Sequence, residues 1–131
     1  WHAILSSDLK LMPTLETPDT FDMGAMKELR QALQQQFHPV LVLRIGGNDL
    51  LNCLALRRPN DMTLYQTPIG ALISNLAGQF LPYGFSLSAP VCEHFSQVKL
   101  LQDELYLDIQ HGLSGKTIIH PAQIPIVHQA F

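Results

Sequence analysis

The chain has 131 residues, enough for one ordinary domain with its own core, and 47% of them are hydrophobic. Charged residues make up only 15%, which excludes a disordered tail. The net charge is −3 and the eight Lys and Arg residues do not cluster, so we expect no nucleic-acid partner. No apolar run reaches about 18 residues, so we expect no membrane partner and no membrane-spanning helix.

The first residue and the two cysteines bear on how the chain is processed and on its redox compartment. The chain begins at Trp1 rather than Met, from which we expect an upstream segment that has been removed or is not shown. No signal peptide is visible. Because there is no secretory signal, Cys53 and Cys92 are expected to be reduced, buried thiols of a cytoplasmic protein.

Short apolar runs alternate with helical patterns along the chain, which is the rhythm of βα units. Strands are expected at 10–15, 40–45, 85–89 and 117–119, and helices at about 22–36, 50–56, 68–80, 96–110 and 122–130. The clearest strand is 40–45, because its apolar, β-branched run is continuous, as in a buried parallel strand. The pattern predicts one α/β domain over 1–131 with about four βα units, half of the roughly 250 residues of a complete eight-unit barrel.

Four polar residues follow the predicted strands, namely Glu16, Asp49, Glu93 and His120. Ligands of parallel α/β folds bind beyond the carboxyl ends of strands, so these positions are candidates for a site. Glu16 and Asp49 could share one Mg²⁺, which takes one or two carboxylates and leaves positions for substrate oxygens. Such an ion polarises a carbonyl and stabilises an enolate. The alternative is that both carboxylates merely cap the helices that follow them.

Other residues allow two interpretations each. Gly46–Gly47 either lets the backbone approach a ligand or forms a tight turn. Arg57–Arg58 either binds a phosphate or carboxylate or is a solvated helix end. Glu93–His94 is either an acid/base pair or a loop carboxylate beside an exposed imidazole. His111 and His120 are either metal ligands or structural, and no spacing typical of a zinc site supports the first interpretation.

Three ordered motifs carry a resemblance to a known superfamily. Residues 115–124, Gly-Lys-Thr-Ile-Ile-His-Pro-Ala-Gln-Ile, resemble the Gly-Lys-x-x-Ile-His-Pro-x-Gln-Ile signature of the citrate lyase β-subunit, malyl-CoA lyase and HpcH/HpaI aldolase superfamily. Residues 15–17 resemble its strand end with a Mg²⁺-binding Glu, and 45–50 resemble its Gly-x-x-Asp-Leu segment. The chain looks most like the branch described as C–C bond lyases of the TIM-barrel fold.

The resemblance implies a (β/α)8 barrel, of which this chain would be the C-terminal half. Members cleave or form a C–C bond next to a thioester or keto carbonyl, usually of a CoA ester, with Mg²⁺ or Mn²⁺ on the substrate oxygens. It implies that Glu16 and Asp49 are the metal ligands. It also suggests that Gly47 and Asn48 line the substrate site through backbone groups. Arg57 and Glu93 are further substrate-binding candidates from their residue chemistry, and no catalytic residue is assigned.

Two parts of the superfamily's site are missing from the chain as shown. The substrate-binding Arg of the relatives lies on an early strand, and their base comes from a C-terminal lid, often of a neighbouring subunit. An open half-barrel also exposes strand edges. We therefore expect a fragment of a longer enzyme, a homo-oligomer that pairs two halves, or a partner chain that supplies the first half.

The leading hypothesis is a Mg²⁺-dependent C–C bond lyase that performs a retro-Claisen or retro-aldol cleavage of a small carboxylate or CoA-thioester substrate. The alternative is a non-catalytic half-barrel that binds an acyl or phosphorylated ligand or a partner protein.

Overall fold

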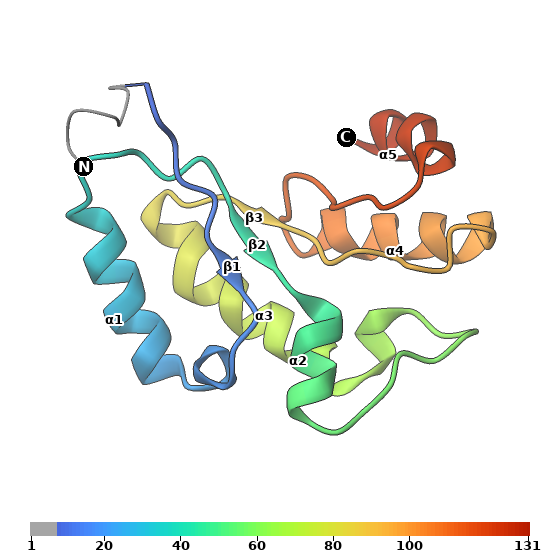
Figure 1. Ribbon diagram of the computed structural model, residues 1–131, viewed down its shortest axis with the longest axis horizontal. Helices are drawn as coiled ribbons and strands as arrows, with labels where there is room; N and C mark the ends of the chain where they lie inside the picture. Colours follow the sequence, from blue (N-terminus) through green and yellow to red (C-terminus); the bar gives the residue numbers. More distant parts are fainter. Residues whose placement is uncertain (1–7) are drawn as a thin grey trace.

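The computed structural model describes residues 8–131, so Trp1 lies outside the described residues. Within this range a parallel sheet has the order β1-β2-β3, formed by β1 (Thr14–Leu15), β2 (Leu43–Ile45) and β3 (Leu87–Ser88). Two helices, α1 (Met23–Gln34) and α3 (Pro68–Phe80), contact each other on one side of the sheet (Figure 1). The predicted α/β class and the parallel pairing are confirmed.

Three further helices complete the described chain. They are α2 (Gly47–Cys53), which follows β2 directly, α4 (Val98–Gln110) and α5 (Ile124–Ala130). Short 3-10 turns occupy Pro18–Phe21, Leu64–Gln66, Leu81–Tyr83 and Pro121–Gln123. Figure 1 shows α4 and α5 side by side, away from α1, and the two helices are in contact. None of the helices among residues 8–131 has the length and apolar character that a membrane crossing requires.

Local chemistry sets the limits of these helices. Asp22 caps α1, because its Oδ1 accepts hydrogen bonds from the backbone N–H groups of Gly24 at 2.8 Å and Ala25 at 3.3 Å. Thr67 caps α3, and Pro68 fills its first position, where a missing N–H costs nothing. After α2, Ala55 adopts a left-handed conformation with φ of 55°, so the helix cannot continue.

The main core lies between the sheet and the α1–α3 pair. The register pairs Leu15 with Ile45 and Leu43 with Leu87, and all four side chains are buried there. Because successive residues of a strand point to opposite faces, the intervening Arg44 lies on the other face. Its neighbours in the register are Thr14 and Ser88. One face of the sheet is therefore apolar and the other polar.

The expected strand at 117–119 is wrong. The chain makes only an isolated parallel bridge there, between Ala89 and Lys116, with the N–H of Ala89 donating to the carbonyl of Gly115 at 2.8 Å. Strand pairing cannot continue because the N–H of Ile119 donates to the side chain of Gln123 at 3.0 Å. The side-chain oxygen of Gln123 thus takes the place of a backbone acceptor on a neighbouring strand. Three strands rather than four are formed among residues 8–131.

The first strand and one cysteine also differ from expectation. The expected strand 10–15 shortens to β1, preceded by a single bridge between Leu11 and Val40, since Pro13 has no N–H for a ladder. Cys92 is buried as expected, whereas Cys53 is exposed. Cys53 is the last residue of a short helix whose buried face is formed by Leu50 and Leu51.

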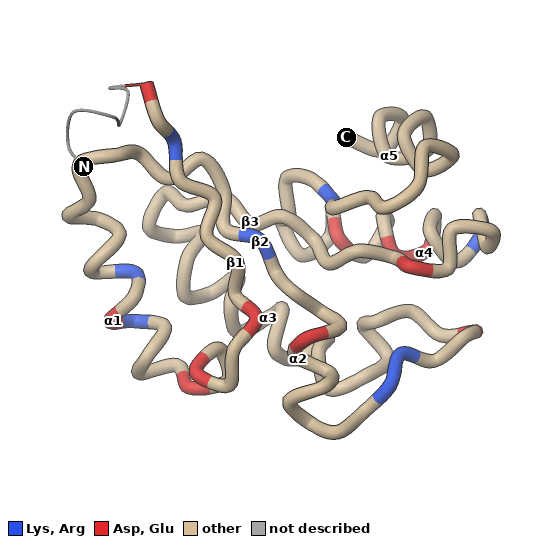
Figure 2. The backbone as a smooth tube through the Cα atoms, viewed as in Figure 1, with Lys and Arg blue, Asp and Glu red and all other residues tan. Residues whose placement is uncertain are grey.

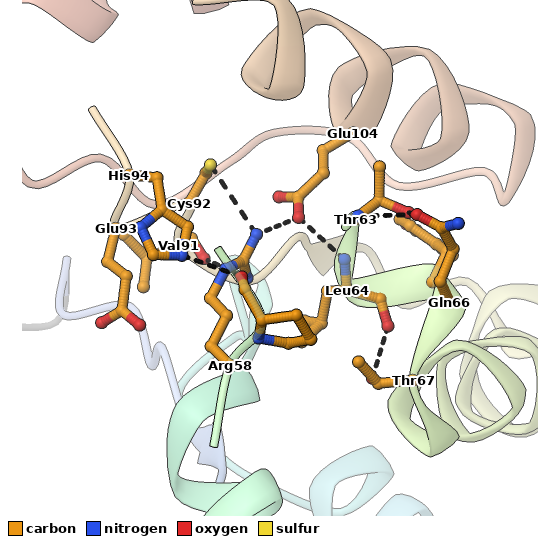
Figure 3. A network of polar contacts seen from close by, with 12 residues as sticks. Arg58, Thr63, Leu64, Gln66, Thr67, Val91, Cys92, Glu93, His94 and Glu104 are labelled. Carbon is orange, nitrogen blue, oxygen red and sulfur yellow. Dashed lines mark hydrogen bonds and ion pairs between the residues drawn. The ribbon is translucent and has the colours of Figure 1, made fainter. Parts of the chain in front are cut away.

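A second core lies between α4 and α5, and a buried charge network joins it to the rest of the chain (Figure 3). Arg58, from the loop after α2, forms an ion pair with Glu104 of α4, and the two side chains are 2% and 1% exposed. Lys116 lies 3.3 Å from the other oxygen of Glu104 and 2.8 Å from Asp108. Glu104 also accepts the N–H of Leu64 at 2.8 Å. The network thus connects the loop of Arg58, the 3-10 turn at Leu64 and the segment of Lys116 to one helix.

Burial sets the protonation tendencies of this network. Desolvation raises the pKa of Asp108, and the nearby Lys116 opposes that shift. Desolvation and the adjacent Asp108 carboxylate raise the pKa of Tyr65, so its hydroxyl stays protonated and donates to Asp108 at 2.6 Å. Desolvation also raises the pKa of the Cys92 thiol. Cys92 is fully buried in the second core, where its thiol packs against apolar side chains.

Replacement of Glu104 tests the structural weight of the network. Glu104→Gln leaves Arg58 buried without a counter-charge and should reduce the free energy of unfolding by about 3–5 kcal/mol. The measurement is urea denaturation followed by circular dichroism. The matched control is Asp103→Asn, which removes the exposed pair between Asp103 and Lys99 and should cost no more than about 0.5 kcal/mol. Equal effects of the two variants would contradict a structural role for the buried pair.

Candidate metal centre and adjoining cavities

The register of β1 and β2 brings Glu16 beside Gly46. The N–H of Gly46 donates to the carbonyl of Leu15 at 2.9 Å, so the chain leaves both strands at the same level. A Cβ atom built on Gly46 would lie 2.7 Å from Cβ of Glu16, 3.2 Å from its Oε2 and 3.4 Å from Oδ2 of Asp49. Carboxylate oxygens from β1 and α2 therefore converge over a residue that has no side chain.

Neither carboxylate serves as a helix cap. Gly46 is the N-cap of α2, and Asp49 lies inside the first turn of that helix. Thr17 precedes the 3-10 turn after β1, and the cap of α1 is Asp22. Both Glu16 and Asp49 are exposed, and within the described part of the chain neither carboxylate forms a hydrogen bond or ion pair. Figure 2 shows acidic positions where β1 ends and on α2.

Glu16 and Asp49 open onto a small cavity of about 140 Å³. Its lining is Thr14, Glu16, Arg44, Ile45, Gly46, Gly47, Asn48, Asp49, Val91 and Thr117. Residues 8–131 contain no group of three or more His, Cys, Asp or Glu side chains placed to share a metal ion. Two carboxylates with open space beside them nevertheless match Mg²⁺, which keeps several waters and uses one or two carboxylates. The donor set suits a hard divalent cation and not zinc.

A second cavity, of about 320 Å³, adjoins the first. Three expected substrate-binding residues, Asn48, Arg57 and Glu93, line it together. The side-chain amide of Asn48 donates to Oε2 of Glu93 at 3.0 Å, which ties the start of α2 to the loop after β3. Asn48 lines both cavities, so the structure brings these three residues together beside the Glu16–Asp49 pair.

Gly47 has a packing role that the sequence did not indicate. A Cβ atom on Gly47 would lie 2.7 Å from Leu64 and 2.8 Å from Pro90. Its backbone also lines the smaller cavity. The absence of a side chain therefore lets α2 pack closely against two neighbouring segments.

Arg58 and His94 are committed to structural contacts. Arg58 is held by Glu104, donates to the carbonyl of Val91 at 3.3 Å, and is not available to an exposed phosphate. Nε2 of His94 lies 3.0 Å from the carbonyl oxygen of Pro59 (Figure 3). Glu93 bonds to Asn48 and His94 to Pro59, and no hydrogen bond joins the two side chains among the described residues. This arrangement does not support Glu93–His94 as an acid/base pair.

The two remaining candidate histidines, His111 and His120, also make structural contacts. Nδ1 of His111 lies 2.7 Å from the carbonyl oxygen of Leu107, and its ring packs against Tyr65. Nδ1 of His120 accepts the N–H of Ala122 at 3.1 Å, which caps a 3-10 turn. Its ring stacks on Phe95 with centroids 4.3 Å apart. Neither lines the cavity of Glu16 and Asp49.

The C-terminal signature motif has a structural explanation. Lys116 neutralises two buried carboxylates, as described above. The side chain of Gln123 donates to the carbonyl of Cys92 at 2.7 Å and accepts the N–H of Ile119. Pro121 occupies the first position of the turn that His120 caps. These residues fasten the end of the chain to the loop that follows β3, next to both cavities.

Sequence reasoning missed three polar residues of the smaller cavity, Thr14, Arg44 and Thr117. Arg44 had a visible signal, because it is the one charged residue in the apolar run 40–45. Thr117 had none, since its position depends on the bridge between Ala89 and Lys116.

Comparison with solved structures supports the same fold. The crystal structure of RipC from Yersinia pestis matches with a TM-score of 0.78 and 19% identity over 98% of this chain and 54% of that one. A citrate lyase β-subunit from Mycobacterium tuberculosis, complexed with oxaloacetate and magnesium, matches with a TM-score of 0.72 and 21% identity over 92% of this chain and 52% of that one. CitE from the same organism, with magnesium, acetoacetate and coenzyme A, matches with a TM-score of 0.73 and 22% identity over 92% and 43%.

The chain thus spans about half the length of the solved structures it matches. The parallel sheet and its helices correspond to about half of each of these chains, which is consistent with the expected partial barrel. A comparison with curated proteins found no match. The family described as C–C bond lyases of the TIM-barrel fold matches residues 1–131, the whole chain. The protein therefore belongs to the C–C bond lyase family of the TIM-barrel fold.

Proposed function

We propose that Glu16 and Asp49 hold a divalent cation, Mg²⁺ or Mn²⁺, and that the chain forms the metal-binding half of a C–C bond lyase. The observation that carries the proposal is the convergence of their carboxylate oxygens over Gly46. Oε2 of Glu16 and Oδ2 of Asp49 lie 3.2 and 3.4 Å from the position that a Cβ atom on Gly46 would occupy. Family membership and the magnesium named for related structures support it. A bound cation supplies Lewis-acid polarisation of a substrate carbonyl oxygen.

The proposed reaction is a retro-aldol or retro-Claisen cleavage of a substrate that carries a carboxylate or a CoA thioester. The bond between the carbons α and β to a carbonyl breaks, the β-hydroxyl loses its proton, and the α carbon gains one. Oxaloacetate, acetoacetate and coenzyme A, named for the related structures, have the chemistry of such substrates and products. The carboxylates of Glu16 and Asp49 would hold the cation and balance its charge.

The cavity of about 320 Å³ is proposed as the substrate subsite beside the cation. Arg57, exposed at its wall, can pair with a phosphate or carboxylate of the substrate. The hydrogen bond between Asn48 and Glu93 fixes the orientation of both side chains where the two cavities meet. Gly47 contributes backbone only. These roles would place the extended part of a thioester along the loop after β3.

One observation favours the second candidate, a non-catalytic binding module. Apart from the two carboxylates and Arg44, no ionisable side chain lines the Glu16–Asp49 cavity among the described residues. The described part therefore offers no separate general base at that cavity. A pairing half or a neighbouring subunit would have to supply one for the lyase, which the proposal also requires.

Metal affinity provides the first test of the proposal. Calorimetric titration of the chain with Mn²⁺ should show binding near one equivalent, and Asp49→Asn and Glu16→Gln should each weaken it by about tenfold or more, because each removes one anionic ligand. Asp19→Asn, an exposed carboxylate outside the cavity, is the matched control and should bind as the wild type does. Unaltered affinity in both ligand variants would rule out this site.

Gly46→Ala tests the convergence itself. The φ of Gly46 is −87°, which alanine tolerates, so the only new feature is a methyl group 2.7 Å from Cβ of Glu16. Displacement of Glu16 should lower Mn²⁺ affinity by about tenfold. Gly78→Ala is the control, since a methyl group there meets nothing within 4 Å, and it should raise stability by roughly 0.5–1 kcal/mol without affecting Mn²⁺. A Gly46→Ala protein with wild-type affinity would refute the geometry.

Turnover separates the two candidate functions. A lyase should release both a 2-oxo acid and a shortened thioester from a β-hydroxyacyl-CoA that carries a carboxylate on its β carbon. Release should stop when the metal is removed with a chelator. The measurement is chromatography of the CoA products with Asp49→Asn as control. Binding of the thioester without any cleavage, in a protein that binds Mn²⁺, would favour the binding module.

A further inference from the structure

We infer that Arg44 is a substrate-binding residue, which holds a carboxylate of the substrate beside the cation of Glu16 and Asp49. This inference rests on the proposed function, because it requires a cation on Glu16 and Asp49 and a substrate that carries a carboxylate. No sequence motif described above includes Arg44 in a site, and its position in the fold carries the argument.

Arg44 is the central charge on the polar face of the sheet. It lies in β2 between Leu43 and Ile45, whose side chains are buried on the other face. Its register neighbours are Thr14 on β1 and Ser88 on β3, so uncharged hydroxyl groups flank it on both sides. Thr14 and Arg44 line the same cavity of about 140 Å³ as the two carboxylates. The guanidinium is thus positioned by a strand and not by a mobile loop.

Arg44 also differs from the other basic residues, all of which are described. Four of them have partners in the structure: Arg30, Arg58, Lys99 and Lys116. Three others are exposed to solvent: Lys10, Lys27 and Arg57. Arg44 is half-buried, and its guanidinium forms no hydrogen bond or ion pair within residues 8–131. A guanidinium that is partly withdrawn from water and has no paired counter-ion is a favourable partner for an incoming anion.

The two nearby carboxylates do not fill that role. They line the same cavity, yet neither forms an ion pair with Arg44, so the guanidinium and the carboxylates face a shared space. A substrate with a carbonyl oxygen on the cation and a carboxylate on Arg44 would fill it with matched charges. The guanidinium fork suits a carboxylate, to which it can donate two parallel N–H bonds. The cavity of about 140 Å³ limits this part of the substrate to a small group.

The test compares a charged probe with its neutral ester. The Kd of pyruvate for the Mn²⁺-loaded chain is measured from the Mn²⁺-dependent broadening of its methyl proton signal, and methyl pyruvate is measured in the same way. Arg44→Gln should weaken pyruvate by about tenfold or more and leave methyl pyruvate unaffected. Arg44→Lys keeps the charge and should give an intermediate Kd for pyruvate. Lys27→Gln, an exposed cation on α1, is the matched control.

The outcomes distinguish the two levels of the proposal. Mn²⁺ binding by both Arg44 variants, with affinity equal to or above that of the wild type, shows that they retain the fold and the metal site. Wild-type pyruvate affinity in Arg44→Gln, or an equal loss for methyl pyruvate, would overturn the role of Arg44 while the metal site stands. Failure of the wild-type chain to bind Mn²⁺ would overturn the proposed function and this inference with it.

Discussion

The parallel pairing of Leu15 with Ile45 is the constraint on which the candidate site depends. It ends β1 and β2 at the same level, so Glu16 leaves its strand beside Gly46. The same register sends alternate side chains to opposite faces, with leucine and isoleucine toward α1 and α3 and Arg44 toward the polar side. A slip by one residue would exchange these two faces and remove both the core and the site. The strand register therefore determines both the packing of the core and the placement of the proposed site residues.

The buried charges act as a second constraint, on the part of the chain beyond β3. Glu104 and Asp108 share α4, Lys116 follows that helix, and Arg58 comes from a loop 46 positions before Glu104. Each of the four side chains is buried with a partner of opposite charge. Removal of one member leaves the others buried without compensation, which is the costly state of such a network. The most specific motif of the sequence, which includes Lys116 and Gln123, thus makes structural contacts that attach the C-terminal segment to the rest of the fold. It holds the loop that carries Glu93 next to the start of α2.

Local patterns predicted the helices and the strands that form β2 and β3, because helix caps, prolines and apolar runs act over a few residues. The carboxyl-end rule also brought Glu16 and Asp49 to one edge of the sheet. What failed depended on distant partners: the strand at 117–119 lost its ladder to the Gln123 side chain, and Cys53 faces solvent. Arg58 was visible only as one of two adjacent arginines, and its burial requires Glu104, 46 positions away. The site role of Arg44 needed the register of β2.

The central claim is that Glu16 and Asp49 bind one divalent cation above Gly46. The most direct measurement is anomalous X-ray scattering from crystals of the chain soaked with Mn²⁺. The account predicts one strong peak between the two carboxylates, at roughly 2.0–2.6 Å from an oxygen of each, with water or buffer oxygens at the remaining positions. A well-ordered crystal with no peak there, or with Mn²⁺ bound only at another site, would contradict it.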